Sequence, residues 1–424
     1  MGRRLRDLTG PHVAVAPAEE VTSRNGAAEV GPREASLGPA DVEAIWRSVV
    51  DLYETGLHPA IALCLRRRGR VVLDRAIGHV SGNAPGDRPN VPKVRATPQS
   101  LFNLFSASKA VTAMVVHHLD ERGLLHLDDA VVEHIPEFGK HGKQSITVRQ
   151  LLTHRAGIPA IPGAPTTLDL LASPERVLEI LCDAKPLSVP GRQLSYHALT
   201  AGFVLGAIVE RVSGRDIRRY LRENVLDPLG FRSFDYGVAP ERLSEVAQHA
   251  RTGLPPTPPL SWMLERALGV DMDTAVELSN DARFLTAIIP SGNVVGTADE
   301  ASRFFQVLLD AMRGRVPERE RERIFAPRTV RRAIAEQSYL EMDSFLGLPV
   351  RYGMGFILGA DRFSLYGPRT PRAFGHVGFT NVVAWADPDR ELAVGLMTSG
   401  KPFVTPGQLH WLNVLRTIAQ RCAP

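Results

Sequence analysis

Strand-like segments occur near both ends of this chain, and the stretch between them has a mostly helical pattern. Residues 60–66 and 70–77 are apolar runs joined by an arginine-glycine turn. Residues 380–386 and 391–398 flank a second turn sequence, Asp387-Pro388-Asp389-Arg390. Residues 131–205 instead show helical spacing interrupted by proline and glycine. Strands from the two ends must meet in one sheet, which predicts an α+β fold with a helical insertion.

Helical periodicity is clearest in three segments. Residues 40–54 carry an apolar residue every three or four positions, which predicts one buried stripe. A second helix follows Ser106 and runs to about Glu121, with Gly123 placed to end it. A final helix over residues 407–420 carries Leu409, Leu412, Leu415 and Ile418.

The pattern also suggests how the chain is divided. Residues 1–38 are rich in Ala, Gly, Pro and Glu without periodicity, which predicts a mobile tail. We expect residues 39–105 and 285–424 to form a sheet-containing lobe and residues 106–284 a mainly helical lobe, with the active site between them. Within the helical lobe, residues 254–290 fit a pocket lid and a surface excursion equally well.

Composition describes an ordinary globular protein, with a net charge of +4 and 44% hydrophobic residues. The densest basic run, residues 66–70, lies between two strands and predicts a solvated turn rather than a nucleic-acid site. The N-terminus lacks an apolar signal-peptide core, and no run is long enough to span a membrane. We therefore expect a cytoplasmic protein. Cys64, Cys182 and Cys422 follow no metal-binding or disulfide pattern.

Ser106 and Lys109 lie three residues apart in Phe105-Ser106-Ala107-Ser108-Lys109, at the start of the second predicted helix. At this spacing both side chains share one face of a helix. A neutral lysine amine can take the proton of a serine hydroxyl and make it a nucleophile. Burial among apolar neighbours would lower the lysine pKa enough for that. The spacing alone is weak evidence, because a helix-capping serine beside a solvated lysine gives the same pattern.

Further segments in order make the case stronger. Gly123-Leu124-Leu125-His126-Leu127-Asp128-Asp129, Leu151-Leu152-Thr153-His154-Arg155-Ala156-Gly157 and Phe374-Gly375-His376-Val377-Gly378-Phe379 follow the Ser-Lys motif. With Tyr196-His197-Ala198, they resemble the serine β-lactamase/penicillin-binding protein superfamily, most of all the class C β-lactamase-like esterases. The resemblance spans roughly residues 40 to 400. It implies a mostly antiparallel sheet flanked by helices, as in the β-lactamase/transpeptidase fold.

The resemblance also implies roles for individual residues. Tyr196 matches a family tyrosine that shuttles a proton between nucleophile and leaving group, and it could act as an anion only if nearby cations lowered its pKa. His376-Val377-Gly378 occupies the place of the family's Lys-Thr-Gly strand, so His376 and Gly378 would lie at the substrate. The backbone N–H groups of Ser106 and Phe379 would form the oxyanion hole.

Two departures from the family pattern bear on the substrate. Ala198 replaces an asparagine that contacts the substrate amide in β-lactamases, and His376 replaces a lysine that supplies a fixed cation. A histidine is mostly neutral at pH 7, so both changes favour neutral esters over β-lactams.

The sequence thus predicts a serine hydrolase that acts on small carboxylic esters through an acyl-enzyme on Ser106, with Lys109 and Tyr196 as base and acid. No metal, cofactor or nucleic-acid partner is expected, and the oligomeric state is left open. Three alternatives remain: an acyltransferase or transesterase, a β-lactamase or D,D-peptidase, and a non-catalytic scaffold of the same fold.

Overall fold

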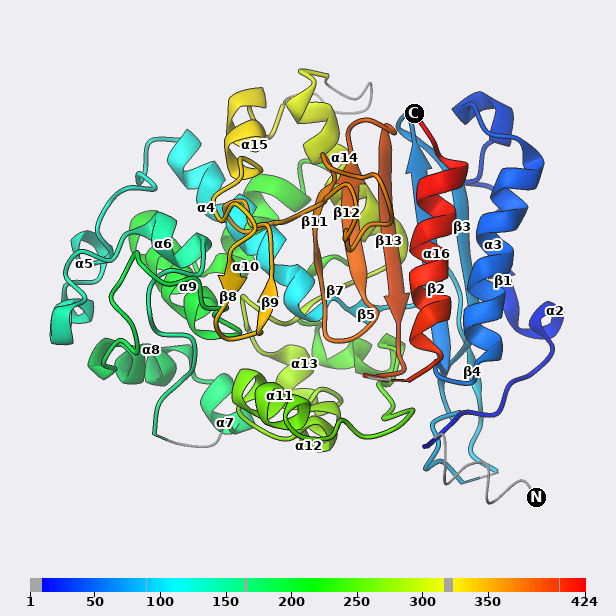
Figure 1. Cartoon of the computed structure of the whole chain (residues 1–424), viewed down its shortest axis with the longest axis horizontal. Coiled ribbons are helices and arrows are strands. Elements are labelled where there is room, and N and C mark those ends of the chain that lie inside the picture. Colours follow the sequence, from blue (N-terminus) through cyan, green and yellow to red (C-terminus); the bar gives the residue numbers. More distant parts are fainter. Residues whose placement is uncertain (1–9, 89, 164–165, 316–322, 404) are drawn as a thin grey trace.

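The computed structural model describes residues 10–88, 90–163, 166–315, 323–403 and 405–424 (Figure 1). Its main feature is an eight-stranded sheet in the order β1-β3-β2-β13-β12-β11-β10, with β4 paired to β3. Every pair of neighbouring strands is antiparallel. The strands are β1 Thr22–Arg24, β2 Ala60–Arg67, β3 Arg70–Ser81, β4 Val94–Arg95, β10 Ile357–Leu358, β11 Phe374–Val377, β12 Val383–Asp387 and β13 Leu392–Thr398. The predicted α+β class with a mostly antiparallel sheet is confirmed.

The two ends of the chain meet at the centre of this sheet, where β2 pairs with β13 from Ile61 opposite Thr398 to Arg67 opposite Leu392. Successive residues of a strand point to opposite faces. Accordingly Ala62 and Cys64 belong to one hydrophobic core and Leu63 to a second core on the other face. Because both faces are covered, these strands are apolar throughout rather than alternating in polarity.

Three helices cover the two faces of the sheet. Figure 1 shows α3 (Pro39–Glu54) and α16 (Gln408–Arg421) side by side on one face, and α14 (Ala298–Met312) on the other. The start of α14 comes very close to the sheet at Gly395, where a Cβ atom would lie 2.5 Å from the Ala298 carbonyl oxygen. Glycine is needed there because no side chain fits between helix and strand.

Most other helices occur in the sequence between β5 (Phe102–Asn103) and β7 (Val294–Gly296). These two strands pair with each other, and β7 also pairs with β6 (Asp235–Tyr236). Nearly every side chain of α4 (Ser108–Glu121) is buried, so this helix is the centre of the helical region. It ends as predicted before Gly123, which has a φ of +69°. The other helices here are α5 Val131–His134, α6 Val148–Leu152, α7 Leu168–Leu171, α8 Pro174–Asp183, α9 Thr200–Ser213, α10 Ile217–Leu221, α11 Leu260–Leu268, α12 Met272–Leu278 and α13 Ala282–Thr286.

Shorter elements complete the described chain. The 3-10 turns are η1 Pro32–Ala35, η2 Phe105–Ala107, η3 Pro136–Gly142 and η5 Pro240–Glu245, and η4 Arg222–Leu226 is a π-helical turn. A small hairpin, β8 Met342–Asp343 and β9 Leu348–Pro349, and the helix α15 Pro327–Ala333 lie between α14 and β10.

The expectation of a mobile N-terminal tail is wrong for residues 10–38. The short helix α2 (Ala18–Val21) leads into β1, which pairs with the edge of β3. Glu29 is buried beside Arg75, and its carboxylate also accepts the backbone N–H of Asp74. A few anchoring side chains are enough to hold this segment on the sheet, and they show no periodicity in sequence. Residues 1–9 lie outside the described residues.

The final helix buries a different face from the one expected. Leu415 and Ile418 are buried, but Leu409 and Leu412 are 68% and 47% exposed. Trp411 and Val414 are buried in their place. The buried stripe is therefore turned toward the tryptophan, whose indole N–H donates to the Asn381 carbonyl oxygen at 3.2 Å.

Candidate active site

Ser106 lies in a strained turn between a strand and a helix. Strand β5 ends at Asn103, whose side-chain oxygen accepts the backbone N–H of Phe105 at 3.0 Å. Phe105 has a φ of +47°, in the left-handed region that a bulky residue avoids at a cost of about 1–3 kcal/mol. The turn η2 that holds Ser106 then leads directly into α4. Ser106 therefore lies directly before α4, in agreement with the predicted helix that follows it.

Lys109 points at this serine from the first turn of α4. Its Nζ lies 3.3 Å from Ser106 Oγ and also donates to the carbonyl oxygens of Ala198, at 2.6 Å, and Ser291, at 3.2 Å. No carboxylate of the described residues forms an ion pair with it, and its residue is only 7% exposed. Burial without a counter-charge lowers the Lys109 pKa to about 7, so a large share of the amine is neutral at neutral pH.

Tyr196 completes the group that the sequence predicted. Its ring centroid lies 4.8 Å from Lys109 Nζ, and its side chain hydrogen-bonds with that of Ser106. Burial raises the Tyr196 pKa above its ordinary value, and the hydrogen bond from Ser106 offsets only part of that effect. The condition for a cation-stabilised phenolate, a lowered pKa, is not met here, and a neutral Tyr196 phenol can donate its proton.

A residue that the sequence did not single out holds Tyr196 in place. Asp343, in the short strand β8, is fully buried and accepts the backbone N–H of Tyr196 at 3.0 Å. The same carboxylate oxygen accepts the N–H groups of Phe345 and Leu346. His154 packs on the other side of the tyrosine, with ring centroids 4.8 Å apart. Both residues help to position Tyr196. The role of Asp343 can be recognised only from its contacts in the fold, because no sequence motif marks it.

His376 and Gly378, which the sequence predicted to lie at the substrate, are on and directly after β11, and His376 packs near Tyr196. His376 is buried, its ring centroid lies 6.4 Å from that of Tyr196, and its Nδ1 lies 2.7 Å from the Val377 carbonyl oxygen. Burial lowers the His376 pKa to about 3, so the ring is neutral and supplies no fixed cation. A Cβ on Gly378 would lie 2.3 Å from the Leu104 carbonyl oxygen. This glycine therefore lets β11 approach the backbone that leads to Ser106.

Phe379, directly after Gly378, is fixed by a second buried lysine. Lys401 Nζ donates to the carbonyl oxygens of Phe379, at 3.2 Å, and Thr398, at 3.0 Å. The same Nζ lies 4.6 Å from the centroid of the Phe105 ring. Lys401 thus connects the two segments that carry the proposed oxyanion donors. It follows β13 in the sequence, and no local motif pointed to it.

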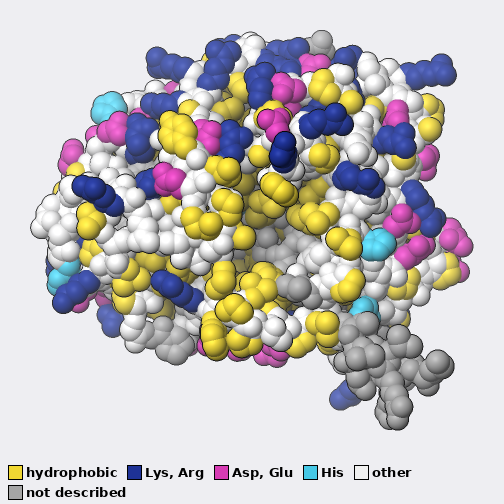
Figure 2. Space-filling model, viewed as in Figure 1, with side chains coloured by type: hydrophobic (Ala, Val, Ile, Leu, Met, Phe, Trp, Pro, Cys, Tyr) yellow, Lys and Arg dark blue, Asp and Glu magenta, His cyan; other side chains and the backbone are white. Residues whose placement is uncertain are grey.

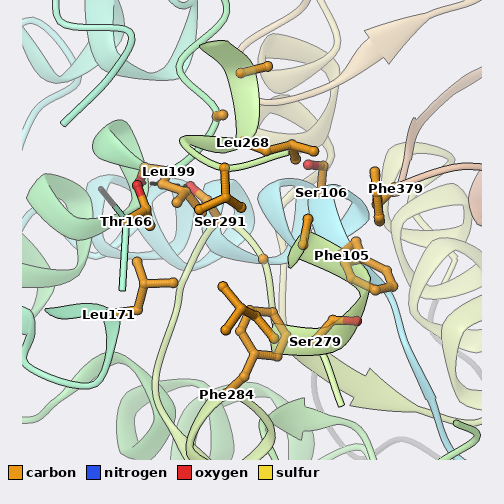
Figure 3. A pocket seen from close by; sticks show the side chains of 16 residues that line it. Phe105, Ser106, Thr166, Leu171, Leu199, Leu268, Ser279, Phe284, Ser291 and Phe379 are labelled. Atoms are coloured by element: carbon orange, nitrogen blue, oxygen red, sulfur yellow. Dashed lines mark hydrogen bonds between the residues drawn. The ribbon is translucent and has the colours of Figure 1, made fainter. Parts of the chain in front are cut away.

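Beside Ser106 opens a pocket with about 680 Å³ of space, including its mouth. Figure 3 shows Ser106, Phe105 and Phe379 along one side and Leu199 and Leu171 across from them. The segment that the sequence left open, residues 254–290, supplies much of the wall through α11, α12 and α13. In Figure 2 this face of the molecule is hollowed near its centre, and hydrophobic side chains surround the hollow.

The basic hairpin tip is tied to the protein itself. Arg66 pairs with Asp299, Arg68 with Glu391 and Arg70 with Glu34. Such ion pairs are typical of arginines in a surface turn. Among the described residues, no three His, Cys, Asp or Glu side chains are placed to hold a metal ion. None of the helices in the described ranges has the length and apolarity that crossing a membrane requires.

Comparison with known proteins agrees with this geometry. The beta-lactamase family model matches residues 47–418. The esterase/beta-lactamase LipL of Mycobacterium tuberculosis is 28% identical over 336 residues, 76% of this chain and 74% of that protein. Esterase EstB of Burkholderia gladioli is 30% identical over 303 residues, 66% of this chain and 74% of that protein.

A solved structure confirms the predicted fold. The crystal structure of a family VIII carboxylesterase superposes with a TM-score of 0.76 at 24% identity, covering 91% of this chain and 98% of that one. The sheet, the helical region and their connections are therefore those of the β-lactamase/transpeptidase fold. The chain belongs to the beta-lactamase family and is a serine hydrolase.

Proposed function

We propose that this protein hydrolyses small carboxylic esters through an acyl-enzyme on Ser106. The observation that carries the proposal is the 3.3 Å contact between Ser106 Oγ and Lys109 Nζ, in a buried site where none of the carboxylates that the structure describes pairs with the lysine. The esterase relatives and the apolar pocket beside the serine support it.

In the acylation step, Ser106 Oγ attacks the ester carbonyl carbon while its proton passes to neutral Lys109. The carbonyl oxygen becomes an oxyanion, which the backbone N–H groups of Ser106 and Phe379 would stabilise. Removing one such donor typically lowers the rate by about 100- to 1000-fold. The bond to the alcohol oxygen then breaks, and that oxygen takes a proton from Tyr196, which regains one directly from the protonated Lys109 beside it.

In the deacylation step, water replaces the alcohol. Lys109 accepts a proton from the attacking water, the acyl group leaves as a carboxylic acid, and Ser106 is restored. The wall of the site combines residues on both sides of Ser106, such as Leu199 from the helical part and Phe379 from the sheet part. This supports an active site between residues 106–284 and the sheet-containing lobe.

Neutral esters suit this site better than β-lactams. The neutral, buried His376 offers no charge for a lactam carboxylate, and Ala198 uses its carbonyl oxygen to hold Lys109 instead of presenting a side-chain amide. The test compares p-nitrophenyl acetate and butyrate with a chromogenic cephalosporin in wild type and Ser106→Ala. We expect ester turnover that Ser106→Ala abolishes, and at most slow cephalosporin turnover.

A fluorophosphonate probe supplies an independent readout, because it labels an activated serine whatever the substrate. Mass spectrometry of the labelled protein should place the adduct on Ser106 and find none in Ser106→Ala. Unlabelled, folded wild type would show a scaffold rather than an enzyme. Product analysis with added alcohols separates hydrolysis from acyl transfer, since only a transferase forms the new ester as its main product.

A further inference from the structure

The pocket beside Ser106 is apolar along its whole length. None of the sixteen residues that line it carries a charge. Its wall includes Leu171, Leu199, Ala267, Leu268, Ala275 and Phe284. The Ser279 hydroxyl, also in the wall, already donates to the Val276 carbonyl oxygen and lies 2.9 Å from His249 Nδ1. Such a surface favours hydrocarbon over any polar group.

The chemistry of acylation decides which half of an ester enters it. Once Ser106 Oγ has bonded to the carbonyl carbon, three substituents remain on that carbon. The oxyanion faces the backbone of Ser106 and Phe379, and the alcohol oxygen faces its proton donor, Tyr196. Tyr196 is not among the residues that line the pocket, whereas Ser106 and Phe379 are. The remaining substituent, the acyl chain, is therefore the one directed into the pocket.

We propose that this pocket, walled in part by α11, α12 and α13, binds the acyl chain of the substrate, and that the enzyme prefers longer aliphatic acyl chains to acetate until the pocket is full. The inference rests on the proposed function and names its substrate class. The apolar wall favours an aliphatic chain over a polar acyl group. The alcohol half, outside this pocket, contributes less to specificity.

Two ester series test this assignment with wild-type enzyme. One series varies the acyl chain of p-nitrophenyl esters from acetate to dodecanoate, and the other varies the alcohol of alkyl acetates from methyl to octyl. We expect kcat/KM to rise about fourfold per added acyl methylene, the equivalent of ~0.8 kcal/mol, until the pocket is full. The alcohol series should stay within a few-fold. A steep alcohol series with a flat acyl series would overturn the proposal.

A pair of matched variants locates the effect. Ala275 lines the pocket from α12, whereas Ala282 is exposed at the start of α13. Ala275→Leu should lower the ratio of octanoate to acetate kcat/KM about tenfold or more, because one added group in an apolar pocket changes specificity by that order. The same substitution at Ala282 should leave the ratio at its wild-type value. Equal effects of the two variants would overturn the placement of the chain.

Leu278→Ala gives the opposite change, because it widens the same wall and should move the optimum to longer acyl chains. The chain-length tests and the test of the proposed function can fail separately. Acetate turnover that needs Ser106 supports the esterase even if the length profile is flat, in which case only the pocket assignment fails. Loss of all ester turnover in folded wild type would instead remove the proposed function.

Discussion

Two buried lysines, Lys109 and Lys401, have similar kinds of contact, but only Lys109 contacts a serine hydroxyl. Each lies over an aromatic ring, with Nζ 4.8 Å from the centroid of Tyr196 and 4.6 Å from that of Phe105, respectively. Each donates to two backbone carbonyl oxygens. Burial lowers the pKa of both to about 7. A perturbed pKa therefore does not by itself identify a catalytic base.

What separates them is the remaining contact of each amine. Lys109 Nζ is within reach of a serine hydroxyl, whereas the hydrogen bonds of Lys401 go to Phe379 and Thr398. The first lysine is placed to exchange a proton with the Ser106 hydroxyl, whereas the second holds a segment of backbone. The comparison predicts that removing either amine lowers activity, but by different amounts and with different pH dependence.

The largest effect should come from Lys109→Met, which keeps the length of the side chain and removes the amine. We expect kcat/KM for a short p-nitrophenyl ester to fall about 100- to 10,000-fold, the usual contribution of a general base. Circular dichroism and thermal unfolding should show that the variant is folded. Retained activity in this variant would mean that Lys401 and Lys109 are equivalent and that the proposed mechanism is wrong.

The pH profile of the wild type should show the lysine that acts as base. With a Lys109 pKa of about 7, only about 1% of the amine is neutral at pH 5, so kcat/KM should be about 100-fold lower at pH 5 than at pH 9. Activity therefore rises with pH through about 7. His376, with its pKa lowered to about 3, should add no limb in this range. A profile that is flat from pH 5 to 9 would contradict Lys109 as the base.

Lys401→Met should have a smaller effect. It releases the Phe379 carbonyl and so loosens the backbone beside the proposed oxyanion hole. We expect kcat to fall about 10- to 100-fold, as displacements of this kind do, with KM little changed. The acid limb of the pH profile should remain, because Lys109 is intact. If the limb disappeared in this variant, the roles assigned to the two lysines would have to be exchanged.

The smallest effect concerns stability. Because the folded-state pKa of Lys401 lies below its unfolded value, the unfolded chain binds more protons between pH 7 and about 10.5, and the cost of burying the Lys401 amine falls as pH rises through that window. The Lys401→Met variant lacks this pH-dependent cost. The difference in free energy of unfolding, wild type minus variant, should therefore increase from pH 7 to pH 9 in urea titrations. A constant difference would mean that Lys401 is not buried as described.

Local pattern predicted the regular elements well. The helix expected at residues 40–54 is Pro39–Glu54, and the hairpin expected around residues 66–70 joins β2 and β3. These segments have strong periodicity and clear turn residues. Strand β1 was missed because it has three residues and gains its stability from the edge of β3. Only tertiary pairing makes it a strand.

In the candidate site too, local pattern predicted some residues, and others could be recognised only from the tertiary structure. Ser106 and Lys109 were found because they share one helical turn, and Tyr196 because a family motif places it. Asp343 and Lys401 lie far away in sequence and act on backbone groups, which carry no side-chain signature. The sequence left the direction of the Tyr196 pKa open, because it depends on burial, which raises it here and cannot be read from a motif.

The pairing of β2 with β13 has a consequence for how the enzyme is made. A ribosome releases the β2–β3 hairpin long before residues 392–398 exist, so β2 must wait with one edge unpaired until those residues have been made. Contacts of such sequence separation form slowly, and an open apolar strand invites association with other chains. The central strand pair of the sheet therefore cannot form until β13 has been made.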